Sequence, residues 1–199
     1  MSKRALNKEK IKNNLLQEAQ RLFSEKGFDD TTVADIVEAA DLGRGTFYNY
    51  FSDVKSIFDA VIDKINSEIQ IVLKEARLEA DNVYELLFLS YKSYLDFVTT
   101  DDMLEFHQKN QAYIRSTSYG SESIRRLVSD LRNDLEPLKE MGEFKEDYEI
   151  QLLSLILVGT PIELFLNIHA ADINIPNKEM ADFLAKFFAK AMKPISGTH

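Results

Sequence analysis

The chain has 199 residues and a formal net charge of −9, with 24 Lys and Arg against 33 Asp and Glu. It contains no Cys, which excludes a disulfide framework, a zinc–cysteine site and a thiol nucleophile. Only 7 Gly and 4 Pro occur, so long helices are favoured over a β-rich fold. A chain of this length can bury a sizeable core and suits one or two domains.

The negative charge is confined to the C-terminal part of the chain. Residues 1–56 hold 9 basic and 9 acidic residues, whereas the rest holds 15 basic and 24 acidic residues. The first 28 residues are basic, with 7 Lys and Arg against 3 Glu. We therefore expect a basic arm on a neutral segment that can approach phosphate, and an acidic body that faces solvent.

Membrane and enzyme signatures are weak. The N-terminus is charged and has no apolar core, so we expect no signal peptide. The uncharged run from Ile150 to Ile162 is shorter than the roughly 20 residues that span a bilayer. The chain also lacks a His-Glu-x-x-His motif and a Gly-rich phosphate loop. We expect a cytoplasmic protein that is not an enzyme and has no membrane partner, no metal and no cofactor.

The most informative segment, residues 31–55, is predicted to contain two short helices joined by a turn. The first has a one-sided apolar face between Val33 and Ala40. Thr32 is a good N-cap, and Asp35 can complete a capping box with it. We expect the first helix to end before Gly43, whose backbone is free to bend in the turn.

The second helix of this pair is predicted at residues 44–51, with Phe47 and Phe51 buried on one face. Its outward face carries hydroxyl, amide and guanidinium groups and no acid. Arginine suits guanine edges, asparagine can pair with adenine, and hydroxyls donate to phosphates. Thr32 and Lys55 are expected to contact phosphate from helix N-termini. The predicted DNA-binding residues are Thr32, Arg44, Gly45, Thr46, Tyr48, Asn49, Tyr50 and Lys55.

This arrangement suits a helix-turn-helix that seats its second helix in the DNA major groove, with Arg44 and Asn49 reading base edges. The alternative from the residues alone is a solvated helical hairpin with surface tyrosines, because such hairpins are common and few bind DNA.

A family resemblance favours the first interpretation. The motifs Gly27-Phe28-Asp29-Asp30-Thr31-Thr32-Val33, Asp35-Ile36, Ala39-Ala40 and Gly45-Thr46-Phe47-Tyr48-x-Tyr50-Phe51 resemble the N-terminal domain of the tetracycline-repressor (TetR) family. The resemblance covers about residues 11–61. It implies an all-helical homodimer that binds operator DNA, with a larger C-terminal domain that holds a small-molecule inducer.

The chain departs from the family pattern at three places. The turn reads Asp41-Leu42-Gly43, where the family often has Gly-Val-Ser. Ala34 replaces a frequent arginine, so one possible base contact is missing. Val54 stands where the family often has a lysine, and the basic residue follows at Lys55.

The whole chain is predicted to be all-α, with a three-helix DNA-binding domain at residues 1–60 and a helical ligand-binding and dimerisation domain at residues 61–199. The long fourth helix, which starts near Asp53, serves both domains, and the boundary falls within it. Pro161 is expected to kink or split the eighth helix. About nine helices are expected, near residues 7–26, 33–40, 44–51, 53–76, 83–98, 101–116, 122–140, 147–170 and 177–193.

The eighth helix is apolar on nearly all sides, so it must be buried on nearly all sides. One subunit can cover one side, and a partner chain is expected to cover another. Glu163 is the exceptional acid of this helix, and a partly exposed rim position is expected for it. The predicted dimer-interface residues are Leu152, Leu155, Ile156, Gly159, Glu163, Phe183 and Phe187.

A ligand pocket is expected where aromatic and polar residues mix in the C-terminal domain. The alternative is an ordinary aromatic core. Because the chosen set has no Lys or Arg, we expect a neutral or cationic, aromatic or lipid-like ligand rather than a phosphorylated one. The predicted ligand-binding residues are Phe88, Tyr91, Tyr94, Phe106, His107, Gln111, Tyr113 and Asn167.

The resulting hypothesis is a homodimeric repressor that binds a palindromic, double-stranded operator and is released by a small-molecule inducer of unknown identity. Two alternatives remain. One is a helical ligand-binding protein whose helix-turn-helix is vestigial and binds no specific site. The other is a helical enzyme that uses the C-terminal cavity.

Overall fold

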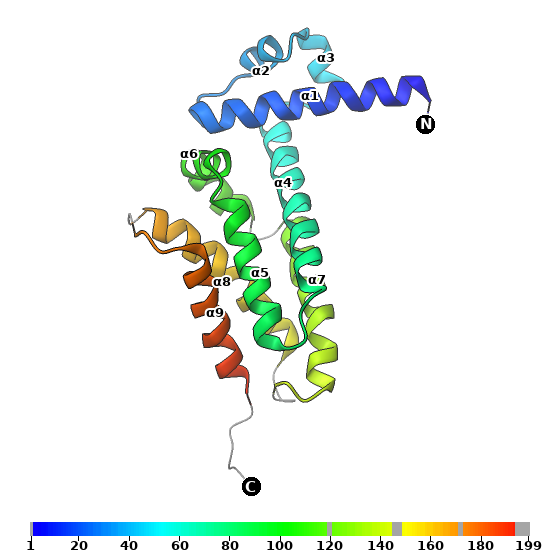
Figure 1. Ribbon diagram of the computed structural model, residues 1–199. Helices are drawn as coiled ribbons and strands as arrows, with labels where there is room; N and C mark the ends of the chain where they lie inside the picture. Colours follow the sequence, from blue (N-terminus) through cyan, green and yellow to red (C-terminus); the bar gives the residue numbers. More distant parts are fainter. Residues whose placement is uncertain (1, 119–120, 145–148, 171–172, 194–199) are drawn as a thin grey trace. The chain divides into compact units, whose positions relative to one another are not determined.

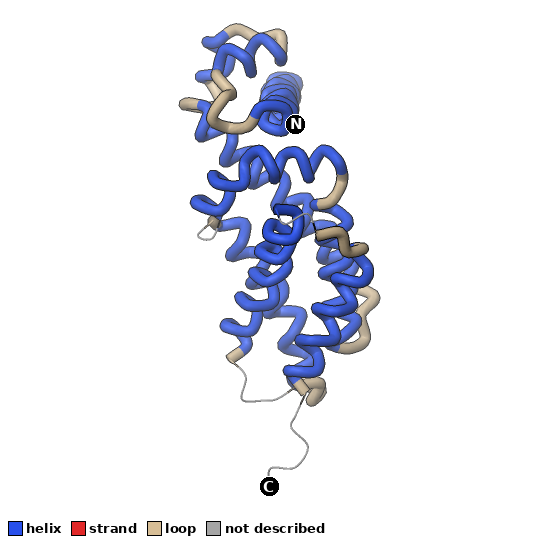
Figure 2. The backbone as a smooth tube through the Cα atoms, turned by 90° about the vertical axis from the view of Figure 1, so that its left-hand side faces the viewer, coloured by secondary structure: helices blue, strands red, loops and turns tan. Residues whose placement is uncertain are grey.

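The computed structural model describes residues 2–118, 121–144, 149–170 and 173–193, and over these residues it contains helices and no strand (Figures 1 and 2). The predicted all-α class with nine helices is confirmed for this part of the chain. The helices are α1 Lys3–Lys26, α2 Val33–Ala39, α3 Arg44–Tyr48, α4 Val54–Arg77, α5 Val83–Val98, α6 Asp101–Ser118, α7 Glu122–Glu140, α8 Ile150–Ala170 and α9 Asn177–Met192.

Residue contacts divide the chain into two compact units. The first comprises Met1–Asn66 and Thr100–Ser118, and the second comprises Ser67–Thr99 and Tyr119–His199. The division falls within the continuous helix α4, and it groups α6 with the N-terminal helices. The functional domain bounds 1–60 and 61–199 stay a prediction.

Helix α1 begins four residues earlier than the predicted Asn7. The Ser2 side chain accepts a hydrogen bond from the Ala5 amide at 3.3 Å, and this N-cap extends the helix to Lys3. The helix ends at Gly27, as predicted, where φ is 85°. Glycine adopts this left-handed φ without the steric cost that a Cβ would bring.

An aromatic cluster forms the core of the first unit and joins α1, α4 and α6. The ring of Phe58 lies 4.8 Å from that of Phe23 and 5.7 Å from that of Phe106, between centroids. Tyr113 contacts the same cluster at 4.7 Å from Phe58. Edge-on and offset ring pairs of this kind stabilise a core beyond their apolar area. Helix α6 is therefore part of the core that supports the N-terminal helices.

The second unit pairs α5 with α9 and α7 with α8. Helix α8 continues through Pro161, so the predicted split does not occur. Proline removes a single backbone donor, to the carbonyl four residues earlier, and the remaining hydrogen bonds can continue the helix. Its buried ring becomes part of a cavity wall.

Several predicted helix boundaries were wrong by a few residues. Helix α3 ends at Tyr48 rather than Phe51, and α6 extends to Ser118 into the predicted loop. Helix α8 begins at Ile150, whereas the predicted start at Asp147 lies outside the described residues. Helix ends commonly shift in this way because capping and final turns depend on tertiary contacts.

Helix α8 is long and apolar enough to cross a membrane by length and composition alone. The apolar segment that meets these criteria is Ile150–Ile168, and 28% of it is buried. This apolar segment is longer than the uncharged run Ile150–Ile162 because it continues past Glu163. Core helices of soluble proteins meet the same two criteria, so the result does not by itself indicate a membrane span.

Candidate nucleic-acid interface and ligand cavity

The start of α2 is fixed by the predicted capping box. The Thr32 hydroxyl accepts from the Asp35 amide at 3.2 Å, and the Asp35 carboxylate accepts from the Thr32 amide at 2.8 Å. The Lys26 ammonium lies 2.8 Å from the same carboxylate. Hydrogen bonds from Lys26 and Thr32 hold the pKa of Asp35 well below its usual range. The Thr32 hydroxyl also donates to Asp35, so a phosphate contact through Thr32 competes with this bond and stays a prediction.

The turn between α2 and α3 bends at a residue that the sequence analysis did not single out. Asp41 has a φ of 53°, in the left-handed region, whereas Gly43 has an extended φ of −82°. The predicted bending role of Gly43 was therefore wrong. Aspartate tolerates this region better than most residues, because its short polar side chain can bond locally.

Helix α3 presents the polar set that was predicted to face DNA. Phe47 and Phe51 are buried beneath it, as predicted, and anchor it to the first unit. The chain leaves the helix through tighter i→i+3 bonds, from Asn49 to Thr46 and from Tyr50 to Phe47. Arg44, Gly45, Tyr48 and Asn49 are exposed, and Thr46 and Tyr50 are half-buried.

Positive charge lies close to the same surface. Helix α3 contains no acidic residue, and the Lys8 ammonium of α1 lies 6.0 Å from the centroid of the Tyr50 ring. The first turns of α1 add exposed Lys3 and Arg4. A hydroxyl-rich helix flanked by cations suits the sugar–phosphate backbone of a duplex.

Lys55, at the start of α4, is tied to α6 within the first unit. Its ammonium lies 2.8 Å from the Asp59 carboxylate and 6.0 Å from the centroid of the Tyr113 ring. The Tyr113 hydroxyl donates to the other oxygen of Asp59 at 3.1 Å. The hydrogen bond with Asp59 raises the pKa of Lys55. A phosphate bound at Lys55 would therefore have to exchange with Asp59.

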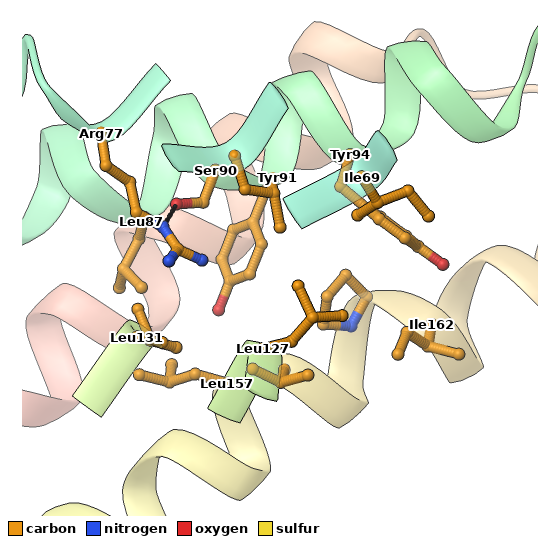
Figure 3. A pocket seen from close by; sticks show the side chains of 13 residues that line it. Ile69, Arg77, Leu87, Ser90, Tyr91, Tyr94, Leu127, Leu131, Leu157 and Ile162 are labelled. Carbon is orange, nitrogen blue, oxygen red and sulfur yellow. Dashed lines mark hydrogen bonds between the residues drawn. The ribbon is translucent and has the colours of Figure 1, made fainter. Parts of the chain in front are cut away.

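A mostly apolar cavity of about 40 Å³ lies within the second unit (Figure 3). Of the eight predicted ligand-binding residues, Tyr91 and Tyr94 line it. The other lining residues were not predicted from the sequence. Its wall is formed by Ile69, Leu73, Arg77, Leu87, Ser90, Tyr91, Tyr94, Leu127, Leu131, Leu157, Val158, Pro161 and Ile162.

Arg77 gives this cavity a charged end. Its side chain is only 6% exposed, and it donates to the Ser90 hydroxyl at 2.9 Å and to the Asp134 carboxylate at 3.0 Å. Burial lowers the pKa of Arg77, and the charge of Asp134 opposes this shift. The premise that the pocket lacks a basic residue therefore does not hold for this cavity. A sequence signal existed, because Arg77 continues the four-residue spacing of the apolar Ile69 and Leu73.

Tyr91 is the unusual residue of the cavity. It is 3% exposed, and its hydroxyl has no hydrogen-bond partner among the described residues. In Figure 3 this hydroxyl points toward Leu127 and Leu157, and the Arg77 guanidinium lies beside the ring. Burial raises the pKa of Tyr91, so the hydroxyl keeps its proton. A buried, unsatisfied hydroxyl costs about 1–3 kcal/mol.

The other six predicted ligand residues lie elsewhere. Phe88 stacks on Tyr84 at 5.9 Å between centroids. Phe106, His107, Gln111 and Tyr113 belong to α6 in the first unit.

Asn167, the last of the six, donates to the Glu163 carbonyl at 2.7 Å on α8. Both residues line a shallow groove with Leu155 and Gly159, residues that were predicted for the dimer interface. A ligand-binding role for these six residues stays a prediction.

Large apolar side chains are exposed on α8 and α9. Phe183 and Phe187 stack on each other at 6.3 Å between centroids, and more than half of each side chain is exposed. Glu163 is half-buried, in line with the predicted rim position. The exposed fractions are 59% for Leu152, 49% for Leu155, 53% for Ile156, 64% for Phe183 and 58% for Phe187.

Known proteins resemble this chain in sequence and in fold. The family model for bacterial regulatory proteins of the tetR family matches residues 15–61. The negative transcriptional regulator IcaR of the biofilm operon icaADBC, from Staphylococcus aureus, is 26% identical over 147 residues, which cover 71% of this chain and 73% of IcaR.

Two solved structures extend the comparison. The fatty acid degradation regulator FadR from Bacillus halodurans superposes with a TM-score of 0.75 at 18% identity, over 90% of this chain and 94% of FadR. RolR in complex with resorcinol gives a TM-score of 0.69 at 23% identity, over 94% of this chain and 90% of RolR. At these identities the structural likeness establishes the fold alone.

The matched segment contains α2, the turn and α3, the elements whose exposed face was described above. The family is not enzymatic, which agrees with the lack of catalytic motifs. No cluster of three or more metal-ligating side chains occurs in the described residues. Residues 15–61 are a helix-turn-helix segment of the TetR-family type, and the chain resembles DNA-binding transcriptional regulators of that family.

Proposed function

We propose that this regulator is a cytoplasmic, homodimeric repressor that binds a palindromic operator and is released by a small-molecule ligand. The observation that carries the proposal is the exposed apolar surface of α8 and α9. The same chain presents α3, the helix expected to enter the major groove, which contains no acidic residue. Repression rather than activation is supported by the similarity to IcaR, a negative regulator that is 26% identical to this chain.

Dimerisation gives the exposed apolar side chains a physical explanation. Large contiguous apolar patches are costly in water and usually mark an interaction surface. A second copy of the chain would cover Leu155, Phe183 and Phe187 through a two-fold axis, and the Gly159 backbone allows close helix approach. The helix-turn-helix segments of the two subunits, related by the two-fold axis, would then recognise the two half-sites of a palindrome.

Ligand release requires a difference in affinity between two states of the protein. A ligand can shift the equilibrium only if it binds the non-operator state more tightly, and operator DNA must then weaken ligand binding by the same factor. Helix α4 contributes residues to both units, so it is our candidate for the lever that links them. The cavity of the second unit is our candidate for the ligand-binding site, and the structure of RolR with resorcinol supports this choice.

The test is selection of bound sequences from random double-stranded DNA by the purified, full-length protein. We expect enrichment of one palindromic sequence whose half-sites are about one helical turn apart. Absence of any enriched sequence would favour the alternative of a ligand-binding protein with a vestigial helix-turn-helix. An enriched sequence without two-fold symmetry would retain DNA binding and exclude the proposed dimer.

A further inference from the structure

The lining of the cavity in the second unit defines the chemistry of its ligand. Four polar side chains line the cavity, those of Arg77, Ser90, Tyr91 and Tyr94. Arg77 and Ser90 are bonded to each other at 2.9 Å, so both are already partnered. The Tyr91 hydroxyl is buried and has no partner among the described residues, although it lies on the wall of this cavity. A buried hydroxyl without a partner is rare in native proteins and calls for a specific explanation.

We propose that the cavity binds a small, neutral, mostly apolar molecule with one hydrogen-bond-accepting oxygen, and that the Tyr91 hydroxyl donates to this oxygen. The proposal deepens the ligand-release function proposed above and rests on it. Phenols, cyclic ketones and small alcohols belong to this class. The remaining wall is formed mainly by leucine, isoleucine, valine and proline side chains, which would contact the apolar body of the ligand.

The charges near the cavity exclude the two ionic alternatives. The Arg77 guanidinium is already paired with the Asp134 carboxylate at 3.0 Å, so its charge is balanced. A carboxylate ligand would add an uncompensated negative charge among leucine side chains, which is costly in a low-dielectric site. A cationic ligand would face the guanidinium of Arg77. A neutral oxygen acceptor satisfies Tyr91 without disturbing the existing ion pair.

Size restricts the class further. A volume of about 40 Å³ has room for roughly two or three water molecules. A long acyl chain therefore does not fit, and the lipid-like part of the sequence-based expectation is dropped for this cavity. A single six-membered ring enters if the half-buried Tyr94 and Ile162 move outward.

Calorimetric titration of the full-length protein, without DNA, compares three probes: phenol, toluene and benzoate. Phenol and toluene have nearly the same shape, and only phenol has an oxygen that can accept from Tyr91. We expect phenol to bind roughly tenfold more tightly than toluene, because it relieves the unsatisfied donor. We expect benzoate to bind more weakly than phenol.

The Tyr91→Phe variant removes the donor and keeps the ring. It should fold at least as well as the wild type, because it removes an unsatisfied buried hydroxyl, and its melting temperature checks this. We expect Tyr91→Phe to bind phenol and toluene equally. The matched control is Tyr84→Phe on the same helix, whose hydroxyl donates to Asp182 and does not line the cavity. This control should keep the wild-type preference.

Four outcomes would overturn the proposal: equal affinities of phenol and toluene in the wild type, a preference that persists in Tyr91→Phe, tighter binding of benzoate, or no binding of either ring with a water molecule on Tyr91 in a crystal structure. None of these depends on operator binding, so the helix-turn-helix function would stand. Conversely, phenol that binds through Tyr91 and leaves the operator complex intact would support the ligand class and contradict ligand release.

Discussion

The side chain of Asn110 on α6 is hydrogen-bonded to the backbone of Phe28, 82 residues earlier in the chain. Its Oδ1 accepts from the Phe28 amide at 2.7 Å, and its Nδ2 donates to the Phe23 carbonyl at 2.9 Å. Asn110 is 2% exposed. The Asn110 side chain thus links α6 to the end of α1, just before α2 and α3. This contact makes α6 a structural part of the first unit.

The substitution Asn110→Ala is therefore expected to destabilise the first unit. It leaves the Phe28 amide without its acceptor, and an unsatisfied buried donor costs about 1–3 kcal/mol. The measurement is urea unfolding followed by circular dichroism. The exposed neighbour Gln108, changed to Ala, serves as the control and should alter stability by no more than about 0.5 kcal/mol. Equal midpoints for both variants would contradict the assigned role of Asn110.

The exposed face of α3 makes separate predictions for base and phosphate contacts. Arg44→Ala is expected to cost about 1–3 kcal/mol on the selected operator and to relax specificity at one base pair. The double variant Thr46→Ala, Tyr48→Phe should weaken binding to all sequences alike, because hydroxyl contacts to phosphate carry no sequence information. Fluorescence anisotropy with labelled duplexes measures both effects.

Arg125→Ala is the matched control for Arg44→Ala, because it removes the same charge from an exposed site on α7 in the second unit. It should leave operator affinity unchanged. If the double variant at Thr46 and Tyr48 bound the operator like the wild type, the proposed docking of α3 would be wrong.

Lys55 is expected to contribute one phosphate contact. Lys55→Ala should reduce the slope of log affinity against log salt concentration by about 1. Asp59→Asn should instead strengthen DNA binding, since it removes the carboxylate that holds the Lys55 ammonium at 2.8 Å. An unchanged salt slope in Lys55→Ala would mean that the ammonium stays on Asp59 in the complex.

Local patterns predicted the helices well because each carries its own signal. Apolar spacing gave the nine segments, and the Thr32 and Asp35 pair predicted the capping box that the structure contains. The missed features depend on contacts between distant segments. Nothing near Asn110 indicates a bond to Phe28.

Most of the cavity lining was missed for a similar reason. Periodicity identifies the inward face of a helix but not the helix that lies opposite, so Arg77 and the leucines of α7 could not be assigned to the same wall as Tyr91. The turn was predicted, but its left-handed residue was misassigned, because Gly43 offered the more obvious flexible backbone and Asp41 adopts the left-handed conformation.

Acid should loosen the start of α2 through Asp35. Its pKa in the folded protein is lowered from the ordinary value of 3.8 by hydrogen bonds from Lys26 and then Thr32. A group with a depressed folded pKa stabilises the protein above its unfolded pKa, and this contribution is lost as the pH falls through the folded pKa. We expect wild type and Asp35→Asn to differ in melting temperature at neutral pH and to converge below pH 3.8. A difference that is constant down to strongly acidic pH would exclude this role.

The dimer surface gives the last prediction. Leu155 and Phe187 are 49% and 58% exposed in the single chain, so an arginine at either position leaves the subunit core intact. In a dimer the same arginine would be buried without a partner, which is strongly destabilising. We expect Leu155→Arg and Phe187→Arg to sediment as folded monomers with weak operator binding, and the control Met141→Arg, at another exposed apolar residue, to remain dimeric. If the wild-type chain sediments as a monomer at micromolar concentration, both the proposed dimer and the proposed palindromic operator are contradicted.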